Sequence, residues 1–323
     1  MPGLRRLFPG AELHWVANTE YVPLVSAAGL DRAIPFERGA WRTWSGAWDG
    51  ARQFARLCAQ MRRGRYGIVI DLQGLARSAV MTAVTGAPLR VGYADAREGA
   101  RLVYNRRIEV DRAHTHAVDC CLAALRSLGM EKPAAAWEWT ALGHHRASVR
   151  ARLGLEPRGY CIVAPAARWH TKEWLPDRFA SVAASLASGH GLKVLLTGDQ
   201  GQAGALDALR AKTISAGCPE TMVAACAGTL SLVELLAACA DARIVVTLDT
   251  GTMHLAASVQ TPTVALMGPT NPVRHGPYGQ LNRVVRPSEC DPCYKRRCPK
   301  GRNCMADITV EQVMTAIGDV LEA

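Results

Sequence analysis

The sequence predicts an α/β protein made of two doubly wound halves, each a parallel sheet covered by helices. The chain has 323 residues, more than the ~250–300 at which single hydrophobic cores stop growing. Short apolar runs alternate along it with helical patterns, as in parallel βαβ units. This alternation stops at a linker-like stretch, LGLEPRGY, and then restarts. We therefore expect two domains.

The elements of the first half follow from its periodicity. Apolar runs predict strands at 11–18, 67–74 and 89–94. Helical patterns lie between them at 21–30, 48–62, directly after Gly74 and at 118–128. These elements place a first domain at 1–152.

The second half repeats the pattern. Strands are expected at 160–166, 192–198, 242–251 and 261–268, and helices at 176–188, 203–211 and 231–240. An amphipathic pattern at 308–321 predicts a last helix that packs back on the body. We therefore place the second domain at 153–306, and the terminal helix within 307–323.

Composition limits the function classes. A hydrophobic content of 49% excludes disorder, and no apolar run approaches the ~18–20 residues of a membrane-spanning helix. The net charge of +10 favours an anionic partner such as a nucleic acid, an anionic lipid or a phosphorylated sugar. The amino terminus lacks the apolar core of a secretion signal, so we expect a cytoplasmic protein whose eleven cysteines are reduced.

The stretch VVTLDTGTMHLAA, residues 245–257, begins as a strand and ends as a helix. Such a corner directs unpaired N–H groups and the positive end of a helix dipole towards a ligand, so Thr250, Gly251 and Thr252 are candidate phosphate donors. Asp249 would cap the helix or accept hydrogen bonds from sugar hydroxyls. Alternatively, Asp249 is only a cap and His254 only a packed helix residue.

Absent motifs narrow the choice. No G-x-G-x-x-G follows a strand and no G-x-x-x-x-G-K-[ST] occurs, which argues against dinucleotide-dependent dehydrogenases and P-loop enzymes. No D-x-D pair occurs either, so a leaving diphosphate would be neutralised by Lys, Arg and helix ends. Ligands of open α/β sheets bind at the carboxyl ends of the strands, so a cleft between the halves is the expected active site.

Long segments of the chain resemble one enzyme family. They are PAARWHTKEWLPDRFASVA, TGDQG and AGTLSLVELLAACADARIVVTLDTGTMHLAASVQTPTVALMGPTNPVRHGPYG in the second half, and YGIVIDLQGLARSA and YADAREGARLVYNRR in the first. Together they resemble glycosyltransferase family 9, the heptosyltransferases of bacterial lipopolysaccharide core assembly. The resemblance covers nearly the whole chain.

The resemblance implies a GT-B fold, in which two Rossmann-like domains face a central cleft. It also implies inverting, metal-independent transfer of heptose from ADP-heptose, without a cofactor, to the inner core of lipopolysaccharide, either Kdo-lipid A or heptosyl-Kdo-lipid A. The enzyme would be a cytoplasmic monomer, peripheral to the inner membrane, that binds no nucleic acid. The alternatives are a family 9 transferase of another sugar or a GT-B sugar-nucleotide epimerase.

Site residues follow from positions that match the family's motifs. Lys172 matches a lysine that contacts the donor phosphates, and Asp249, Thr250 and Gly251 match the donor-binding Asp-Thr-Gly, with His254 on the following helix. The acceptor is an anionic inner core, which guanidinium groups are suited to bind. The candidate acceptor-binding residues are Arg62, Arg63, Arg65, Gln73, Arg77 and Arg97.

The chain departs from the family at its beginning. Relatives open with a central strand and a Gly-Asp corner whose Asp is the general base, whereas here the recognisable part starts at MPGLRRLFPGAE. We therefore expect a sheet that lacks its first strand, leaving its neighbours unpaired, and we interpret Met1 as an internal methionine. We therefore assign no catalytic residue. Asp71 lies on a neighbouring strand and could be proposed as a substitute for the family's general base, but only its position supports that role.

A cysteine-rich tail is the second unusual feature. Cys290, Cys293, Cys298 and Cys304 have a spacing that could bind a structural Zn²⁺ tetrahedrally, although a metal-free structural tail is the favoured interpretation. With its Lys and Arg residues the tail also leaves open a nucleic-acid-binding protein with a metal site made of these four cysteines. The tail resembles that of heptosyltransferase II, while REGARLVYNRR resembles heptosyltransferase I.

Overall fold

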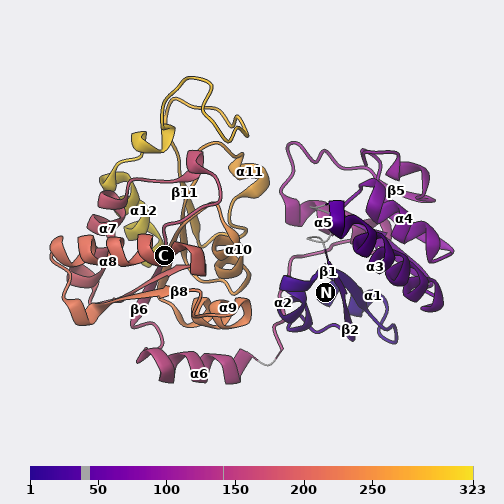
Figure 1. The fold of residues 1–323 in the computed structure, drawn as a ribbon, viewed down its shortest axis with the longest axis horizontal. Coiled ribbons are helices and arrows are strands. Elements are labelled where there is room, and N and C mark those ends of the chain that lie inside the picture. Colours follow the sequence, from indigo (N-terminus) through magenta and orange to yellow (C-terminus); the bar gives the residue numbers. More distant parts are fainter. Residues whose placement is uncertain (38–43, 141, 323) are drawn as a thin grey trace. The chain divides into compact units, whose positions relative to one another are not determined.

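The computed structural model describes residues 1–37, 44–140 and 142–322. The chain forms two compact units, Met1–Thr140 and Ala141–Ala323, and each is considered by itself (Figure 1). Both units are α/β, and every strand pair in both is parallel.

The first unit contains two separate sheets. One is the pair β1-β2 and the other is β3-β4-β5. The strands are β1 (His14–Asn18), β2 (Arg32–Phe36), β3 (Ile68–Asp71), β4 (Leu89–Tyr93) and β5 (Arg106–Ile108). The helices are α1 (Pro2–Leu7), α2 (Val22–Ser26), α3 (Trp44–Arg63), α4 (Ala76–Val84) and α5 (Ala117–Ser127).

The second unit has one six-stranded sheet in the order β11-β10-β9-β6-β7-β8. Its strands are β6 (Tyr160–Ala164), β7 (Lys193–Gly198), β8 (Val223–Ala227), β9 (Ile244–Leu248), β10 (Thr263–Leu266) and β11 (Asn282–Val285). Its helices are α6 (Leu142–Leu153), α7 (Pro176–His190), α8 (Ala203–Ser215), α9 (Leu232–Asp241), α10 (Gly251–Ser258), α11 (Pro272–His275) and α12 (Val310–Leu321). Numbered along the chain, this is the 3-2-1-4-5-6 order of a doubly wound sheet.

Every helix and strand expected from periodicity is present, and the structure adds the strands β2, β5, β8 and β11 and the helices α1, α6 and α11. The added strands are three to five residues long, and β5 consists of Arg106, Arg107 and Ile108, which gives no apolar run to detect. Helix α6 has one buried residue, Val149, and therefore no apolar stripe.

Helix α6 also moves the domain boundary relative to the predicted 152/153. It packs on α9 in the second unit, so the units divide after Thr140. The contact depends on Asp241, whose side chain is 2% exposed. Its carboxylate accepts hydrogen bonds at 2.8 Å from Arg146 Nε and from Arg150 Nη1. A buried carboxylate needs such partners, and the two arginines that satisfy it tie α6 to the second unit.

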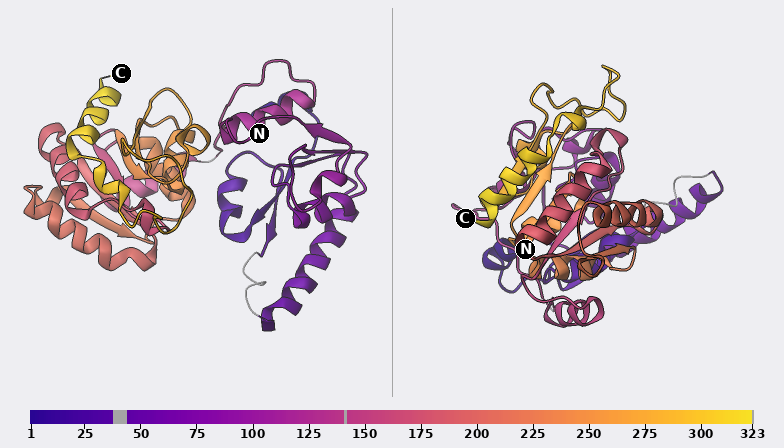
Figure 2. Two further views of the ribbon diagram at one scale, coloured as in Figure 1. Left: turned by 90° about the horizontal axis from the view of Figure 1, so that it is seen from above. Right: turned by 90° about the vertical axis from the view of Figure 1, so that its left-hand side faces the viewer.

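The C-terminal helix α12 packs against α7, β10 and β11 of the same unit (Figure 2). Its Val313 and Ile317 are fully buried in the core. Trp174 fixes the start of this segment, because its Nε1 donates to the Ile308 carbonyl at 3.0 Å. Among the residues described, no helix is long and apolar enough to cross a membrane.

Candidate functional site

The predicted corner is formed where β9 meets α10. Strand β9 is buried along its whole length, and the turn that follows lies at the carboxyl end of this strand. Thr250 is the N-cap of α10 and its side chain makes no capping hydrogen bond, so the first amides of the helix keep their donor capacity. A Cβ built on the exposed Gly251 would meet nothing within 4 Å, so the corner is open rather than filled by side chains.

Asp249 does not cap the helix. Its Oδ2 accepts from Lys172 Nζ and from Thr270 Oγ1, both at 2.6 Å. The side chains of Asp249 and Lys172 are 9% and 15% exposed, which makes this a partly buried ion pair. Asp249 thus holds the ammonium group of Lys172 beside the start of α10.

His254 is not a packed helix residue either. It is exposed, whereas Met253 and Leu255 on either side of it are buried. Thr252, in the first turn of the same helix, is half-buried. The structure therefore excludes both parts of the alternative interpretation of this stretch.

Lys172 lies on the loop that follows β6, in the 3-10 turn His170–Lys172. Strands β6 and β9 are neighbours in the sheet, as the first and fourth strands of a doubly wound order. Their carboxyl ends meet where the strand order reverses, which is where open α/β sheets bind ligands. Lys172 and Asp249 therefore come together at the position the fold favours for a site.

The surroundings of Lys172 add positive charge. Its Nζ lies 4.7 Å from the centre of the Trp169 ring, and the Arg296 guanidinium lies 5.4 Å from the same centre. Arg296 belongs to the cysteine-rich tail, which is held nearby by a hydrogen bond from Thr171 Oγ1 to the Lys295 carbonyl at 2.9 Å. Two cations around one ring leave the site electropositive despite Asp249.

His275, at the end of α11, was not predicted as a site residue. Burial lowers the pKa of its imidazole from the usual 6.5; Arg274, His254 and Lys172 also lower it, and Asp249 opposes them. The neutral form of the ring is therefore favoured relative to that of a free histidine. Thr270, His275, Trp169 and Arg296 were all missed because each takes its place through folding of loops, although all except Arg296 lie in the segments that resemble family 9.

The acceptor-side residues do not form one group. Arg62 and Arg63 end α3 and Arg65 follows them, all before β3 begins. Gln73, Arg77 and Arg97 lie around the turn at the opposite end of β3; Arg97 N donates to the Gly74 carbonyl at 3.0 Å. A four-residue strand separates the two sets by about 13 Å at 3.3 Å per residue.

Asp71 is occupied by structural hydrogen bonds. Its Oδ1 accepts from the amides of Gln73 and Gly74 at 2.9 and 3.0 Å, and its Oδ2 accepts from Tyr104 Oη at 2.6 Å. The side chain is buried, and burial together with this carboxylate raises the pKa of Tyr104. Asp71 shapes the turn after β3, so the geometry gives it no role as a base.

All eleven cysteines are free thiols. Cys290, Cys293, Cys298 and Cys304 line a common pocket of about 240 Å³. Arg302 Nη2 lies 3.9 Å from Cys290 Sγ. Within the described part of the chain, no group of three or more Cys, His, Asp or Glu side chains is arranged to hold a metal ion.

Comparison with known proteins identifies the family. Residues 54–303 match the model of glycosyltransferase family 9 (heptosyltransferase). The chain belongs to this family and is a glycosyltransferase. Among relatives, it is 24% identical to the lipopolysaccharide core heptosyltransferase OpsX of Haemophilus influenzae over 96% of this chain and 88% of that one. It is 28% identical to lipopolysaccharide heptosyltransferase 1 of Escherichia coli K12 over 87% and 86%.

Solved structures of the family share the fold. Heptosyltransferase II of E. coli superposes with a TM-score of 0.77 at 22% identity, covering 99% of this chain and 92% of that one. An E. coli heptosyltransferase solved with ADP gives 0.77 at 24% identity, covering 99% and 94%. The family 9 protein of Veillonella parvula gives 0.79 at 22% identity, covering 99% and 91%. The predicted GT-B fold class is thereby confirmed.

Proposed function

We propose that this glycosyltransferase transfers heptose from ADP-heptose to the inner core of lipopolysaccharide. The observation that carries the proposal is the open corner at the start of α10, where Asp249 binds Lys172 directly before the uncapped N-terminus of the helix. Amide donors and one ammonium group suit a diphosphate, which needs several donors and a counter-charge.

The same groups would assist the departure of the nucleotide diphosphate from the sugar. As the bond from the sugar to the diphosphate breaks, negative charge builds on the phosphate oxygens. Lys172, with the α10 amides of Gly251 and Thr252, is positioned to stabilise that charge, and Arg296 adds a second cation. The sequence contains no D-x-D carboxylate pair for a divalent ion, in agreement with a metal-independent transfer. That the transfer inverts the anomeric centre is proposed from the resemblance to family 9.

The identity of the donor is proposed from relatives. One similar structure is an E. coli heptosyltransferase with ADP, and another of 25% identity contains ADP-2-deoxy-2-fluoro heptose. His254 and Asp249 would meet the sugar hydroxyls, because both border the open corner. By their names, two relatives that match over most of the chain are lipopolysaccharide heptosyltransferases, and one of them, OpsX, is a heptosyltransferase of the lipopolysaccharide core.

The acceptor is proposed to be Kdo-lipid A or heptosyl-Kdo-lipid A, bound by the first unit. Gln73, Arg77 and Arg97 are the better candidates, because they lie at the carboxyl end of β3, where ligands of such sheets bind. A net charge of +10 favours an anionic lipid surface. We propose a monomer at the cytoplasmic face of the inner membrane.

Donor binding by isothermal titration calorimetry tests the proposal. ADP-heptose should bind more tightly than ADP, and UDP-glucose should bind weakly. Lys172→Ala should weaken ADP-heptose binding roughly 10- to 100-fold, as expected for a charge-assisted hydrogen bond of ~1.5–3 kcal/mol. Asp249→Ala should also weaken it, because the ammonium group loses its anchor.

Lys212→Ala is the matched control, since Lys212 forms an exposed ion pair with Asp177 in the same unit. It should leave donor affinity unchanged. Normal ADP-heptose affinity in both Lys172→Ala and Asp249→Ala would remove the site assignment. Preference for a UDP-sugar would instead indicate a family 9 transferase of another sugar.

A further inference from the structure

Three consecutive residues of the cysteine-rich tail contact different elements around the donor site. Tyr294 N donates to the Pro269 carbonyl after β10 at 2.8 Å, and the Tyr294 ring meets the His275 ring of α11 edge-on, with 5.9 Å between the ring centres. Lys295 and Arg296 contact the loop that follows β6. The position of Arg296 beside the site therefore depends on how firmly this part of the tail is held.

Cysteines stand at both ends of this part of the tail. Residues 291–303, here called the tail loop, run between Cys290 and Cys304 and form neither helix nor strand. The Cys290 carbonyl accepts a hydrogen bond from Arg286 Nη2 at 3.1 Å, and Cys304 begins a 3-10 turn that leads towards α12. Both ends of the tail loop are thus attached to regular structure of the second unit, while the loop itself is irregular.

The thiols at the two ends of the tail loop are in contact with each other. The Cys304 thiol donates a hydrogen bond to Cys290 Sγ. Cys304 is also packed against the end of β10, because a Cβ built on Gly268 would lie 3.5 Å from its Sγ. A disulfide requires the two Cβ atoms to lie within about 3.5–4.5 Å of each other. Since the sulfur atoms already meet, forming this bond needs only a small approach of the two ends.

The two thiols differ in exposure and in their neighbours. Cys290 is half-buried, whereas Cys304 is buried. Arg302 Nη2 lies 3.9 Å from Cys290 Sγ. A guanidinium group beside a cysteine favours the thiolate, which is the nucleophilic form of the side chain. Cys290 is therefore suited to attack a reagent from solution, and Cys304 is placed to react with Cys290 afterwards.

The other two cysteines of the tail raise the alternative of a metal site. Cys293 and Cys298 line the same pocket as Cys290 and Cys304. Over the ranges 1–37, 44–140 and 142–322, however, no group of three or more Cys, His, Asp or Glu side chains is arranged to hold a metal ion. The geometry therefore supports a reaction between two thiols rather than coordination by four.

We infer that Cys290 and Cys304 are a redox-active pair that forms a reversible disulfide by exchange with low-molecular-weight disulfides, and that this bond fixes the tail loop beside the donor site. In a reducing compartment such disulfides are transient and serve redox sensing. The effect on the donor rests on the proposed function, whereas the reaction of the two thiols does not depend on it.

The reaction consists of two thiol–disulfide exchanges. The Cys290 thiolate attacks one sulfur of the small disulfide, forms a mixed disulfide and releases a small thiolate, which takes up the proton that Cys290 has lost. Cys304 then gives up its proton and attacks the Cys290 sulfur, so that the bond between the two cysteines forms and a second small thiol leaves with that proton. The protein thiols lose two electrons and two protons, and the reagent gains both as two thiols.

Closing the disulfide restricts the tail loop. A crosslink between the ends of a chain segment removes extended conformations of the segment between them. Fixing a loop in the conformation that binds a ligand raises affinity, because less conformational entropy is lost on binding. Arg296 lies within the tail loop and beside the Trp169 ring, so the oxidised protein should present this cation to the donor more constantly than the reduced protein does.

Disulfide mapping in glutathione buffers tests the pair directly. The 323-residue protein is equilibrated with mixtures of reduced and oxidised glutathione, free thiols are trapped by alkylation, and the linked peptides are identified by mass spectrometry. We expect a reversible Cys290–Cys304 linkage, and hydrogen–deuterium exchange of residues 291–303 that slows roughly tenfold in the oxidised protein. Absence of this linkage, or linkage of Cys290 to another cysteine instead, would overturn the inference.

Two serine variants identify the role of each thiol. Cys304→Ser should stop at the mixed disulfide between Cys290 and glutathione, and Cys290→Ser should leave Cys304 unmodified at the same glutathione ratio. Cys121→Ser is the matched control, because Cys121 is an exposed thiol of the first unit, and it should keep the parental linkage. Rapid glutathione attachment to Cys304 in Cys290→Ser would contradict the assigned order of attack.

Titration with ADP-heptose separates the redox pair from the proposed function. The oxidised parent should bind ADP-heptose roughly two- to tenfold more tightly than the reduced parent, and Cys304→Ser should show no such difference. Equal affinities, with the disulfide formed, would overturn the link to the donor site. A disulfide that forms in a protein with no affinity for ADP-heptose would instead contradict the proposed function. Stoichiometric zinc in the purified protein, with the tail thiols unreactive, would overturn the redox pair.

Discussion

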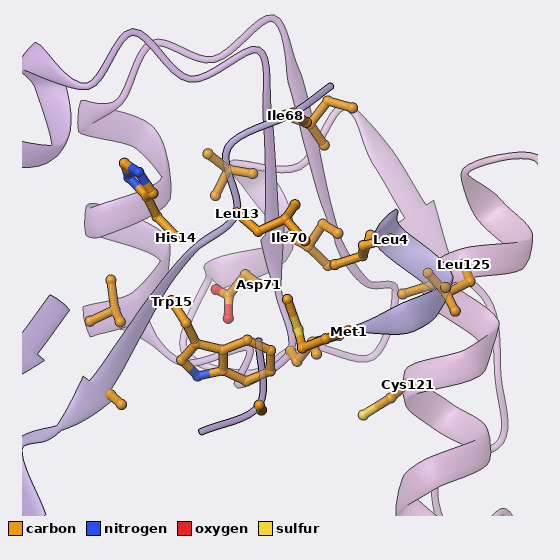
Figure 3. A pocket seen from close by; sticks show the side chains of 18 of the residues that line it. Met1, Leu4, Leu13, His14, Trp15, Ile68, Ile70, Asp71, Cys121 and Leu125 are labelled. Atoms are coloured by element: carbon orange, nitrogen blue, oxygen red, sulfur yellow. The ribbon is translucent and has the colours of Figure 1, made fainter. Parts of the chain in front are cut away.

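The first unit has two separate sheets, of two and three strands, whereas the second has one continuous six-stranded sheet. Its central strand β6 is fully buried between two partners, and the loop after it delivers Lys172 to Asp249 at the end of β9. In the first unit a cavity is lined by both β1 and β3 (Figure 3), and Asp71 at the end of β3 is engaged by the amides of its own turn and by Tyr104. The comparison teaches that β6 does two things in the second unit. It joins β7 and β9 into one sheet, and the loop that follows it brings Lys172 to the site.

The largest expected effect is a difference in stability between the units. About five unmade strand hydrogen bonds at ~1 kcal/mol each would cost the first unit about 5 kcal/mol. At the ~2–4 °C per kcal/mol typical of domains of about 150–250 residues, residues 1–140 should melt roughly 10–20 °C below residues 141–323. Scanning calorimetry with exchange measured by segment checks this. A single transition in which both units exchange together would contradict the comparison.

The next effect concerns the attachment of α6 to the second unit. Asp241→Ala removes the buried carboxylate that ties α6 to α9 through Arg146 and Arg150. Because both arginines are partly exposed and can be rehydrated, we expect about 2–3 kcal/mol of destabilisation, lower than for a fully buried pair. Urea unfolding should show the loss in the second transition only.

Asp177→Ala is the control for Asp241→Ala, since Asp177 forms an exposed pair with Lys212. It should change stability by less than about 0.5 kcal/mol. An equal loss in both variants would mean that α6 is not held by Asp241.

Most of the architecture was predictable from the sequence, for identifiable reasons. The strands β6 and β9 are continuous apolar runs, so periodicity alone reveals them. The corner at 249–251 follows because a buried strand that runs into a Gly-containing turn and a helix has few other geometries.

The rest depended on tertiary contacts that no local pattern records. The predicted domain boundary fell after the segment that forms α6 rather than before it, because the partner of this helix, Asp241, lies 95 residues after Arg146 and 91 residues after Arg150. Thr270 and Arg296 reach the site through loops and a tail that periodicity does not describe. The predicted acceptor residues on either side of β3 were grouped because they are close in sequence, but the strand lies between them.

A smaller effect tests the orientation of Lys172. Thr270→Val removes the hydroxyl that donates to Asp249 Oδ2 at 2.6 Å, while keeping the shape of the side chain. Asp249 then loses one of two anchors, and about 1 kcal/mol of donor binding should be lost, or roughly fivefold in affinity. Calorimetric titration with ADP-heptose measures it. Thr171→Val is the control, because Thr171 Oγ1 bonds instead to the Lys295 carbonyl; an equal loss there would contradict a specific role for Thr270.

The smallest effect is a pH dependence of the stability of the second unit. The pKa of His275 is lowered from 6.5 in the folded protein, chiefly by burial, so below that pH the unfolded chain binds more protons. The stability linked to His275 is therefore fully present above pH 6.5 and decreases as pH falls below it. His275→Gln removes this contribution, so the thermal midpoint of the second unit should fall less between pH 7.5 and 5.5 in the variant than in the parent. His190→Gln, at the exposed end of α7, is the matched control for the substitution itself, and a parental slope in His275→Gln would contradict a role for His275 in the pH dependence.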